Sequence, residues 1–318
     1  MIKVRVKEQS LYATLRNGIT QFQKDEMPLL GLNSSLEEEV LIRQLIDSIR
    51  RIDYVFTLQQ RPISSQRMNP NSSLFDPIRA AIHYKDHNYD EACWLVFLFT
   101  HFGKPQSTGW RLLADIYGAL GDDEYWSWER IRNDIAGFRR WFGNASLQMQ
   151  RDGITRRFGN HRKYESIRSN ASRSLDKVIE SYVTWIGYSG QHAVKFGELT
   201  DHCSQDPRQS FEAIYQSMRC VLSFGRTARF DYLTMLRKTG FLDVEAPLLF
   251  INEATGPLRG ARQLFYGNIN ANVGASALED KLEILSNSLE LERLTKQVLE
   301  DALCNWQKSP AHYLYFTG

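Results

Sequence analysis

Hydrophobic positions recur with a helical period along most of the chain. From Ser35, apolar residues stand at 36, 40, 41, 45, 49, 52 and 56, and Ser35 with Glu38 forms a capping-box pattern. Asp76-Pro77 and Asp206-Pro207 each place a capping side chain before a proline at the first helical position. Only "IKVRVK" at the start is typical of a strand. The pattern predicts an all-α protein.

The most apolar segment is "ACWLVFLF" at 92–99, which Asp90 can cap and Gly103 can end. It is far shorter than the roughly 20 residues of a membrane span, so it predicts a buried central helix. Further helices are expected at about 108–119, 123–142, 172–187, 208–224, 228–239, 257–265 and 276–306.

The polar stretch "QQRPISSQRMNPNSS" at 59–73 is broken by two prolines and is the best candidate for a linker. We therefore expect an N-terminal helical segment over residues 1–70 and a main helical domain over 71–318, integrated into one unit.

Composition narrows the class of protein without naming a partner. The 318 residues are 42% hydrophobic and carry a formal net charge of +2. Four widely spaced cysteines and the absence of an apolar leader favour a reducing cytoplasm, and we expect a monomer. The chain lacks HExxH, GxSxG and Walker A patterns, so zinc hydrolysis, serine-hydrolase chemistry and P-loop nucleotide binding have no support. No cofactor or metal is expected.

Charge is distributed unevenly. From Arg139 to Arg173 there are nine basic residues against two acids. Cations near phosphates supply much of the affinity for nucleic acid, and aromatic rings can stack on unpaired bases. The segment "RRFGNHRKYES" at 156–166 therefore offers DNA-binding candidates: Arg157, Asn160, His161, Arg162 and Lys163. The alternative is a solvated charged helix face, although Gly159-Asn160 favours a loop.

Aromatic residues gather between 109 and 131. Trp110 and Trp126, together with Tyr164 and Glu165 of the basic segment, are candidates for a pocket that holds a base swung out of the duplex. Packing in the core is the more frequent use of tryptophan and remains the alternative.

The segment "EATGPLRGARQLF" at 253–265 places glycines at a predicted helix start. Gly256, Arg259, Gly260 and Arg262 could bind a DNA phosphate in a manner loosely like a helix-hairpin-helix. A helix whose glycines permit close packing explains the pattern equally well.

An acid with apolar neighbours is a candidate for the catalytic carboxylate. In "SFGRTARFDYLTML" at 223–236, Asp231 is such an acid, although pairing with an arginine is the commoner role. Near the C-terminus, "LEDALCNWQK" places Cys304 among acids without an identifiable base, so packing is expected for this cysteine.

Five ordered segments, "EACWLVFLFTHFGK", "FGNHRKYES", "FGRTARFDYLTML", "ATGPLRGARQLF" and "LEDALCNWQK", together resemble the alpha-glutamyl/putrescinyl thymine pyrophosphorylase family, clade 3, from about residue 36 to the end. The resemblance implies a helical domain related to helix-hairpin-helix DNA glycosylases and substrates that are hypermodified pyrimidines in bacteriophage DNA. Some relatives resemble transferases that displace pyrophosphate with an amine, and others resemble glycosylases that act against phage.

The resemblance also implies residue roles. A catalytic aspartate after the hairpin corresponds to Asp280, and Glu300 and Asp301 of the C-terminal helix are rival acids. Because the hairpin holds arginines and no lysine, an imine-forming lyase step is not expected. Asn305 stands where the wider family carries an acid, which counts slightly against the transferase.

These observations predict a monofunctional DNA glycosylase that excises a hypermodified pyrimidine from phage DNA, with Asp231, then Asp301 and Asp280, as its catalytic carboxylate. A transferase and a non-catalytic sensor of modified DNA are the alternatives.

Overall fold

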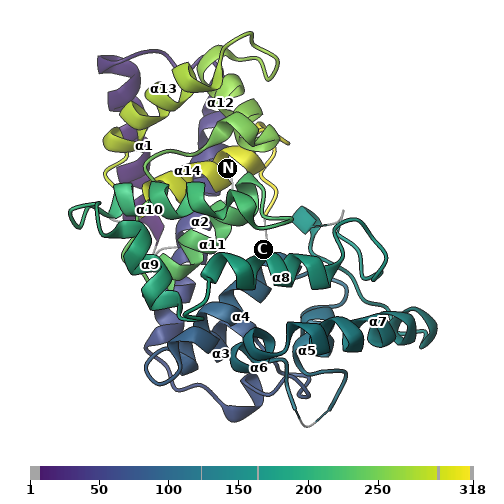
Figure 1. Cartoon of the computed structure of the whole chain (residues 1–318). Helices are drawn as coiled ribbons and strands as arrows, with labels where there is room; N and C mark the ends of the chain where they lie inside the picture. The colour runs from purple at the N-terminus through teal and green to yellow at the C-terminus, as the bar shows by residue number, and fades with distance from the viewer. Residues whose placement is uncertain (1–7, 123, 163–164, 292–293, 316–318) are drawn as a thin grey trace. The chain divides into compact units, whose positions relative to one another are not determined.

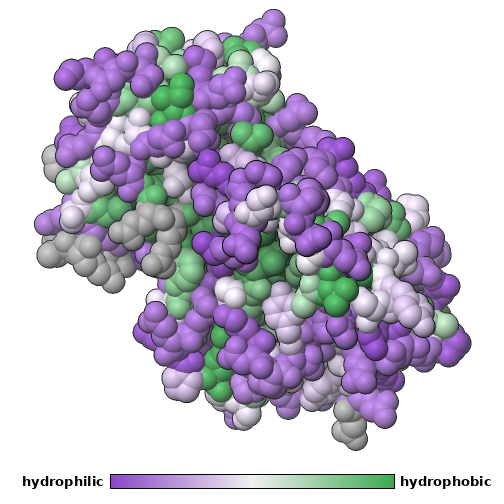
Figure 2. All heavy atoms as spheres, turned by 60° about the vertical axis from the view of Figure 1, so that its left-hand side comes forward, coloured by the Kyte–Doolittle hydropathy of each residue, from purple (hydrophilic) through white to green (hydrophobic). Residues whose placement is uncertain are grey.

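The computed structural model describes residues 8–122, 124–162, 165–291 and 294–315. The described part is all-α, with no strand in it (Figure 1). The strand expected at "IKVRVK" lies outside the described residues. Hydrophilic side chains cover most of the face shown in Figure 2, with hydrophobic ones scattered among them. Among the described helices, none is long and apolar enough to cross a bilayer.

The chain divides into two compact units. The first combines Met1–Phe56 with Ala246–Gly318, and the second is Thr57–Glu245. The division near residue 57 lies close to the predicted linker. The second division, near residue 246, returns the chain to the first unit and differs from the expected domain over 71–318.

In the described residues, the first unit is built from α-helices that its two chain segments supply. They are α1 (Gln9–Asp25), α2 (Ser35–Gln59, whose last turn enters the second unit), α12 (Thr255–Tyr266), α13 (Ala275–Ser288) and α14 (Thr295–Trp306). Phe22, Leu264 and Trp306 are buried together in its core. The capping residues of α2 are one position earlier than predicted, because Glu37 accepts from both the N–H and the hydroxyl of Ser34.

The second unit surrounds α4 (Tyr89–Phe102) with other helices. These are α3 (Pro77–Tyr84), α5 (Arg111–Tyr117), α6 (Trp128–Asn133), α7 (Ile135–Arg151), α8 (Leu175–Ile186), α9 (His192–Thr200), α10 (Pro207–Ser217) and α11 (Arg226–Lys238), with short 3₁₀ turns between some of them. Every α4 residue except Tyr89, Asp90 and Phe99 is buried. The predicted central helix is confirmed.

The caps at proline-preceding aspartates are as predicted: Asp76 accepts from Arg79 N–H and Asp206 from Arg208 N–H. At α4 the cap is Asn88, which accepts from Glu91 N–H, and the expected cap Asp90 lies inside the helix. The side chain of Asp90 is therefore available for a different contact.

Candidate active site

The basic segment "RRFGNHRKYES" folds as a loop and one 3₁₀ turn against the end of α4. The Gly159 N–H donates to the Phe102 carbonyl over 2.8 Å. A Cβ on Gly159 would lie 3.0 Å from the Cα of Gly103, which itself has φ of +61°. Both glycines are therefore required by the close approach of two backbones.

The arginines of this segment divide into two groups. The side chain of Arg156 is 3% exposed, and its guanidinium pairs with Asp115 and with Asp152. Arg162 is also buried, and its Nε donates to the Thr100 carbonyl over 3.0 Å. Arg157, in contrast, is exposed. The two buried arginines fix the loop, which differs from the expectation that Arg162 meets DNA directly.

Two further DNA-binding candidates, Asn160 and His161, are exposed beside this loop. Lys163 and Tyr164 lie outside the described residues. The loop thus combines a buried anchor with exposed polar side chains.

A cluster that we call the carboxylate site consists of Arg162, Glu165, Ser223 and Asp231. Arg162 Nη2 lies 3.4 Å from Asp231 Oδ2, and the Ser223 hydroxyl donates to Glu165 Oε2 over 2.9 Å. The side chain of Asp231 is 41% exposed, so it remains accessible after pairing. The structure therefore brings together three residues, Arg162, Glu165 and Asp231, for which the sequence predicted separate roles.

Burial raises the pKa of Glu165, while the Ser223 hydrogen bond and the charges of Arg173 and Arg162 act in the opposite direction. A carboxyl group with a raised pKa can carry a proton to a leaving group. A carboxylate nearby can stabilise positive charge that develops on a substrate. The carboxylate site thus has the groups for acid–base and electrostatic catalysis. Ser223, with φ of +62°, begins the segment 223–236, but no role was predicted for it.

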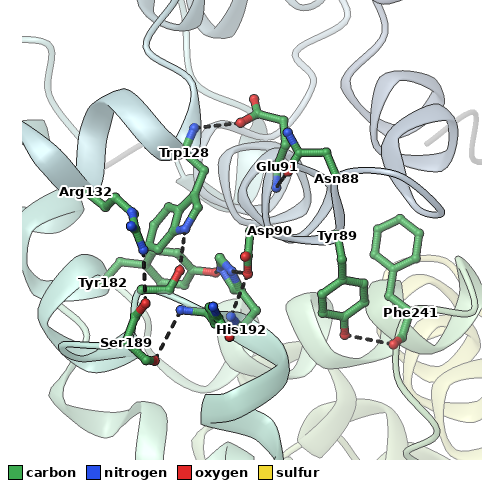
Figure 3. Close-up of polar contacts among 12 residues, drawn as sticks. Asn88, Tyr89, Asp90, Glu91, Trp128, Arg132, Tyr182, Ser189, His192 and Phe241 are labelled. Atoms are coloured by element: carbon green, nitrogen blue, oxygen red, sulfur yellow. Dashed lines mark hydrogen bonds and ion pairs between the residues drawn. The ribbon is translucent and has the colours of Figure 1, made fainter.

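The opposite end of α4 carries a buried polar network (Figure 3). Asp90 Oδ1 accepts from the backbone N–H and from Nδ1 of His192, over 2.7 and 2.8 Å. His192 Nε2 lies 2.8 Å from the Tyr182 hydroxyl, which lies 2.9 Å from the Tyr232 hydroxyl. Burial lowers the pKa of His192 against the opposing effect of Asp90, so the ring is neutral near pH 7. This chain of hydrogen bonds links α4, α8, α9 and α11.

Glu91 extends the network toward α5 and α6. Its carboxyl oxygens accept from the Tyr117 hydroxyl over 2.5 Å and from the Trp128 N–H over 2.6 Å. Burial raises the pKa of Glu91 to about 7, despite these two hydrogen bonds. The sequence signal for the network was the pair Asp90-Glu91 at the start of an apolar helix, which we interpreted only as a cap.

The predicted base-pocket tryptophans occupy different surroundings. Trp126 is 3% exposed, and the Arg130 guanidinium lies 3.9 Å from its ring centroid. Trp110 precedes α5, and its Nε1 has no hydrogen-bond partner in the described part of the chain. Residues that flank Trp110 in the sequence help to line a depression of about 380 Å³. Its lining residues are Ser107, Thr108, Arg111, Ile154 and Thr155. The surroundings of Trp126 are those of a core side chain, whereas Trp110 lies nearer to solvent.

The predicted hairpin glycines belong to the first unit and pack helix against helix. A Cβ on Gly256 would lie 2.6 Å from Cys304 Sγ, and one on Gly260 would lie 2.4 Å from the Leu303 carbonyl oxygen. A short 3₁₀ turn, Ile251–Glu253, precedes α12 where a hairpin would need a full helix. These glycines therefore have a packing role between α12 and α14, and Cys304 packs as expected.

The remaining candidates of the first unit are dispersed. Arg259 is exposed, and Arg262 donates from Nη2 to the Val273 carbonyl over 3.0 Å. Asp280 is exposed on α13. Asp301 pairs with Arg51 over 2.8 Å and accepts from the Ser48 hydroxyl. Within this unit the structure does not gather them into a cluster like the carboxylate site.

A family model described as alpha-glutamyl/putrescinyl thymine pyrophosphorylase clade 3 matches residues 36–318. The chain belongs to this family. The match covers both units, so the carboxylate site and the buried polar network both lie within the family region. No comparable match was found among curated proteins or solved structures. The description names an enzyme of modified-thymine chemistry, which agrees with the sequence resemblance.

Proposed function

We propose that this member of the clade 3 family is a DNA glycosylase that excises a hypermodified thymine-type base from bacteriophage DNA. The supporting observation is the carboxylate site, where the accessible Asp231 pairs with Arg162 and the charge of the same arginine acts on Glu165, whose pKa burial raises. Both carboxyl groups act on the target nucleotide once it leaves the base stack, a step that costs a few kcal/mol.

Exposed cations of the second unit hold the DNA backbone. Arg157 and Arg168 are exposed and form no ion pair with other described residues. Phosphates can therefore approach them without breaking an internal contact, and release of counterions contributes to the affinity. The buried Arg162 contributes indirectly, because it fixes the loop that presents Arg157.

The reaction replaces the bond from C1′ to the base with a bond from C1′ to water oxygen. The electron pair of the broken bond leaves with the base, which receives a proton from the protonated fraction of Glu165. Asp231 stabilises the positive charge that develops on the sugar and accepts the proton that water loses. Proton exchange with solvent restores both carboxyl groups.

The second candidate function is the transferase, which the family description favours. An amine would attack the carbon attached to C5 of the thymine ring and pyrophosphate would leave, so the base stays on the sugar. Asp231 or Glu165 would accept the proton from the amine, and exposed arginines would bind the leaving pyrophosphate.

One experiment separates these functions. Purified protein is incubated with phage DNA that carries hypermodified pyrimidines and with unmodified DNA, and the polymer and released small molecules are measured by mass spectrometry. Free modified base with abasic sites supports the glycosylase. A mass change on bases still in the polymer supports the transferase, and no change in either fraction contradicts both enzymes and favours a binding protein.

Asp231→Asn is the matching test of the site. It should abolish whichever product appears, whereas Asp243→Asn, which alters an exposed carboxylate paired with Arg237 in the same unit, should retain it. Equal product from both variants would remove Asp231 from the mechanism.

A further inference from the structure

His101 is buried at the end of α4 among phenyl rings. Its ring is 1% exposed and lies nearly parallel to Phe97 and to Phe224, with centroid distances of 6.2 and 6.5 Å. Phe102 and Phe158 meet it edge to face, at 5.2 and 5.8 Å. The imidazole thus occupies a place that a phenyl ring would fill well.

One polar atom of this ring, Nδ1, is not used by the fold. Nδ1 is inaccessible to solvent and has no hydrogen-bond partner among the residues that the structure describes. Burial, reinforced by the charge of Arg162, lowers the pKa of His101 to about 3. The ring is therefore neutral at any physiological pH, with one nitrogen that donates and one that accepts a hydrogen bond. A buried polar atom without a partner destabilises the protein relative to an apolar replacement.

Two neighbours of His101 connect it with residues of the carboxylate site. Arg162, which pairs with Asp231, donates to the carbonyl of Thr100, the residue before His101. Phe224, which stacks parallel to the His101 ring, follows Ser223, the hydrogen-bond donor to Glu165. The charge of Arg162 also acts on the His101 ring, so the imidazole lies near the arginine that pairs with Asp231.

Phe158 gives a route to the ring. Of the four phenyl rings around His101, Phe97, Phe102 and Phe224 are buried, while Phe158 is partly exposed. Phe158 belongs to the loop that Gly159 fastens to α4, so its side chain can turn without moving a helix. The Phe158 ring stacks on Phe102 at a centroid distance of 5.5 Å and an interplanar angle of 3°, so the space that it fills is lined by an aromatic face.

We propose that His101 is a substrate-binding residue, whose Nδ1 forms a hydrogen bond with the edge of the extruded pyrimidine when that ring displaces the side chain of Phe158 and turns into the plane of the imidazole. This inference rests on the proposed function, and it assigns the contact that recognises the ring itself. The carbonyl oxygens and the N3–H of a thymine-type base supply either an acceptor or a donor to the neutral imidazole. Because the modification at C5 leaves that edge unchanged, His101 would bind modified and unmodified thymine rings alike.

The test uses a duplex with one 5-hydroxymethyluracil next to 2-aminopurine, whose fluorescence rises when the neighbouring base leaves the stack. His101→Phe should weaken binding of the extruded state about tenfold, which corresponds to one lost hydrogen bond. The same variant should unfold at an equal or higher urea concentration than the wild type, because it removes an unpartnered polar atom.

Rescue variants separate a polar contact from a change in ring shape. His101→Asn places an amide near the position of Nδ1 and should restore most of the binding, whereas His101→Gln, whose amide reaches toward Nε2, should restore less. If His101→Phe extrudes the base as well as the wild type does, the inference is wrong and the proposed function stands. If the wild type extrudes no base from this duplex, the proposed function fails and the inference fails with it.

Discussion

The two ends of α4 each lie beside a buried histidine, and the two histidines differ in their hydrogen bonding. At the start of the helix, His192 has a partner for both ring nitrogens, Asp90 and Tyr182. At the end of the helix, His101 Nδ1 has none in the described structure, and Asp231, which pairs with Arg162, is 41% exposed. A satisfied buried network stabilises a unique arrangement of helices, whereas an unsatisfied group next to accessible carboxylates is suited to a ligand. We therefore expect a stabilising role at one end and propose a binding role at the other.

The largest effect is expected at the end of the helix. Asp231→Asn should reduce product formation by about 10²–10⁴-fold, the usual range for loss of a positioned acid–base group. Its unfolding midpoint should change little, because the ion pair with Arg162 is long and partly exposed. Single-turnover kinetics and urea unfolding measure the two quantities. A large loss of stability with unchanged turnover would reverse the comparison.

At the start of the helix, His192→Phe should reduce the free energy of unfolding by about 2–4 kcal/mol. The substitution leaves the Tyr182 hydroxyl and the Asp90 carboxylate without their ring partner, and each unsatisfied buried group costs about 1–3 kcal/mol. Urea unfolding measures the change, with His202→Phe at an exposed position as the control. A variant as stable as the wild type would mean that the network does not stabilise the unit.

Glu91, at the start of α4, should make the stability of the protein depend on pH. Its pKa rises from an ordinary value of 4.5 to about 7 on folding, so the folded state binds more protons between these values. Stability should therefore fall as pH rises from about 4.5 through 7, by up to about 1.4 kcal/mol per pH unit. Glu91→Gln should remove this slope in urea unfolding at several pH values. Glu129→Gln, an exposed acid on α6, should keep the slope, and an unchanged slope in Glu91→Gln would contradict the assignment.

The smallest effect concerns the basic loop. Arg157→Ala should weaken DNA binding a few-fold and reduce the salt dependence by about one counterion, without loss of stability. Arg162→Ala should instead destabilise the second unit, because the buried guanidinium holds the loop to the Thr100 carbonyl. Filter binding at several salt concentrations tests this, with Arg16→Ala, an exposed cation of the first unit paired with Glu38, as the control. Equal binding by Arg157→Ala and the wild type would leave the loop without a role in DNA contact.

The helical class and the central helix could be predicted because they depend on local periodicity, as at 92–99. Asp231 and Glu165 were identified singly from residue type and neighbours. The pairing of Asp231 with Arg162 could not be predicted in this way. The two residues are 69 positions apart and the guanidinium is buried, and no local sequence pattern encodes either fact. The network at Asp90 was missed for the same reason, since His192 lies 102 residues away.

The glycines at 256 and 260 show the opposite difficulty. A glycine before a helix and another within its first turns fit both a phosphate grip and close helix packing, and only the distances to Cys304 and Leu303 identify the packing. Sequence alone could not separate the two, because both uses require the same absent side chain.

The order of the two units along the chain has a consequence during synthesis. All residues of the second unit, Thr57–Glu245, are contiguous, so its contacts can form while the ribosome is still translating. The first unit must wait until residues 57–318 have been added, a delay of roughly 13–50 s at about 5–20 residues per second. During that interval the apolar faces of α1 and α2 have no final partner, and they are the segments for which a nascent-chain chaperone would have most to protect.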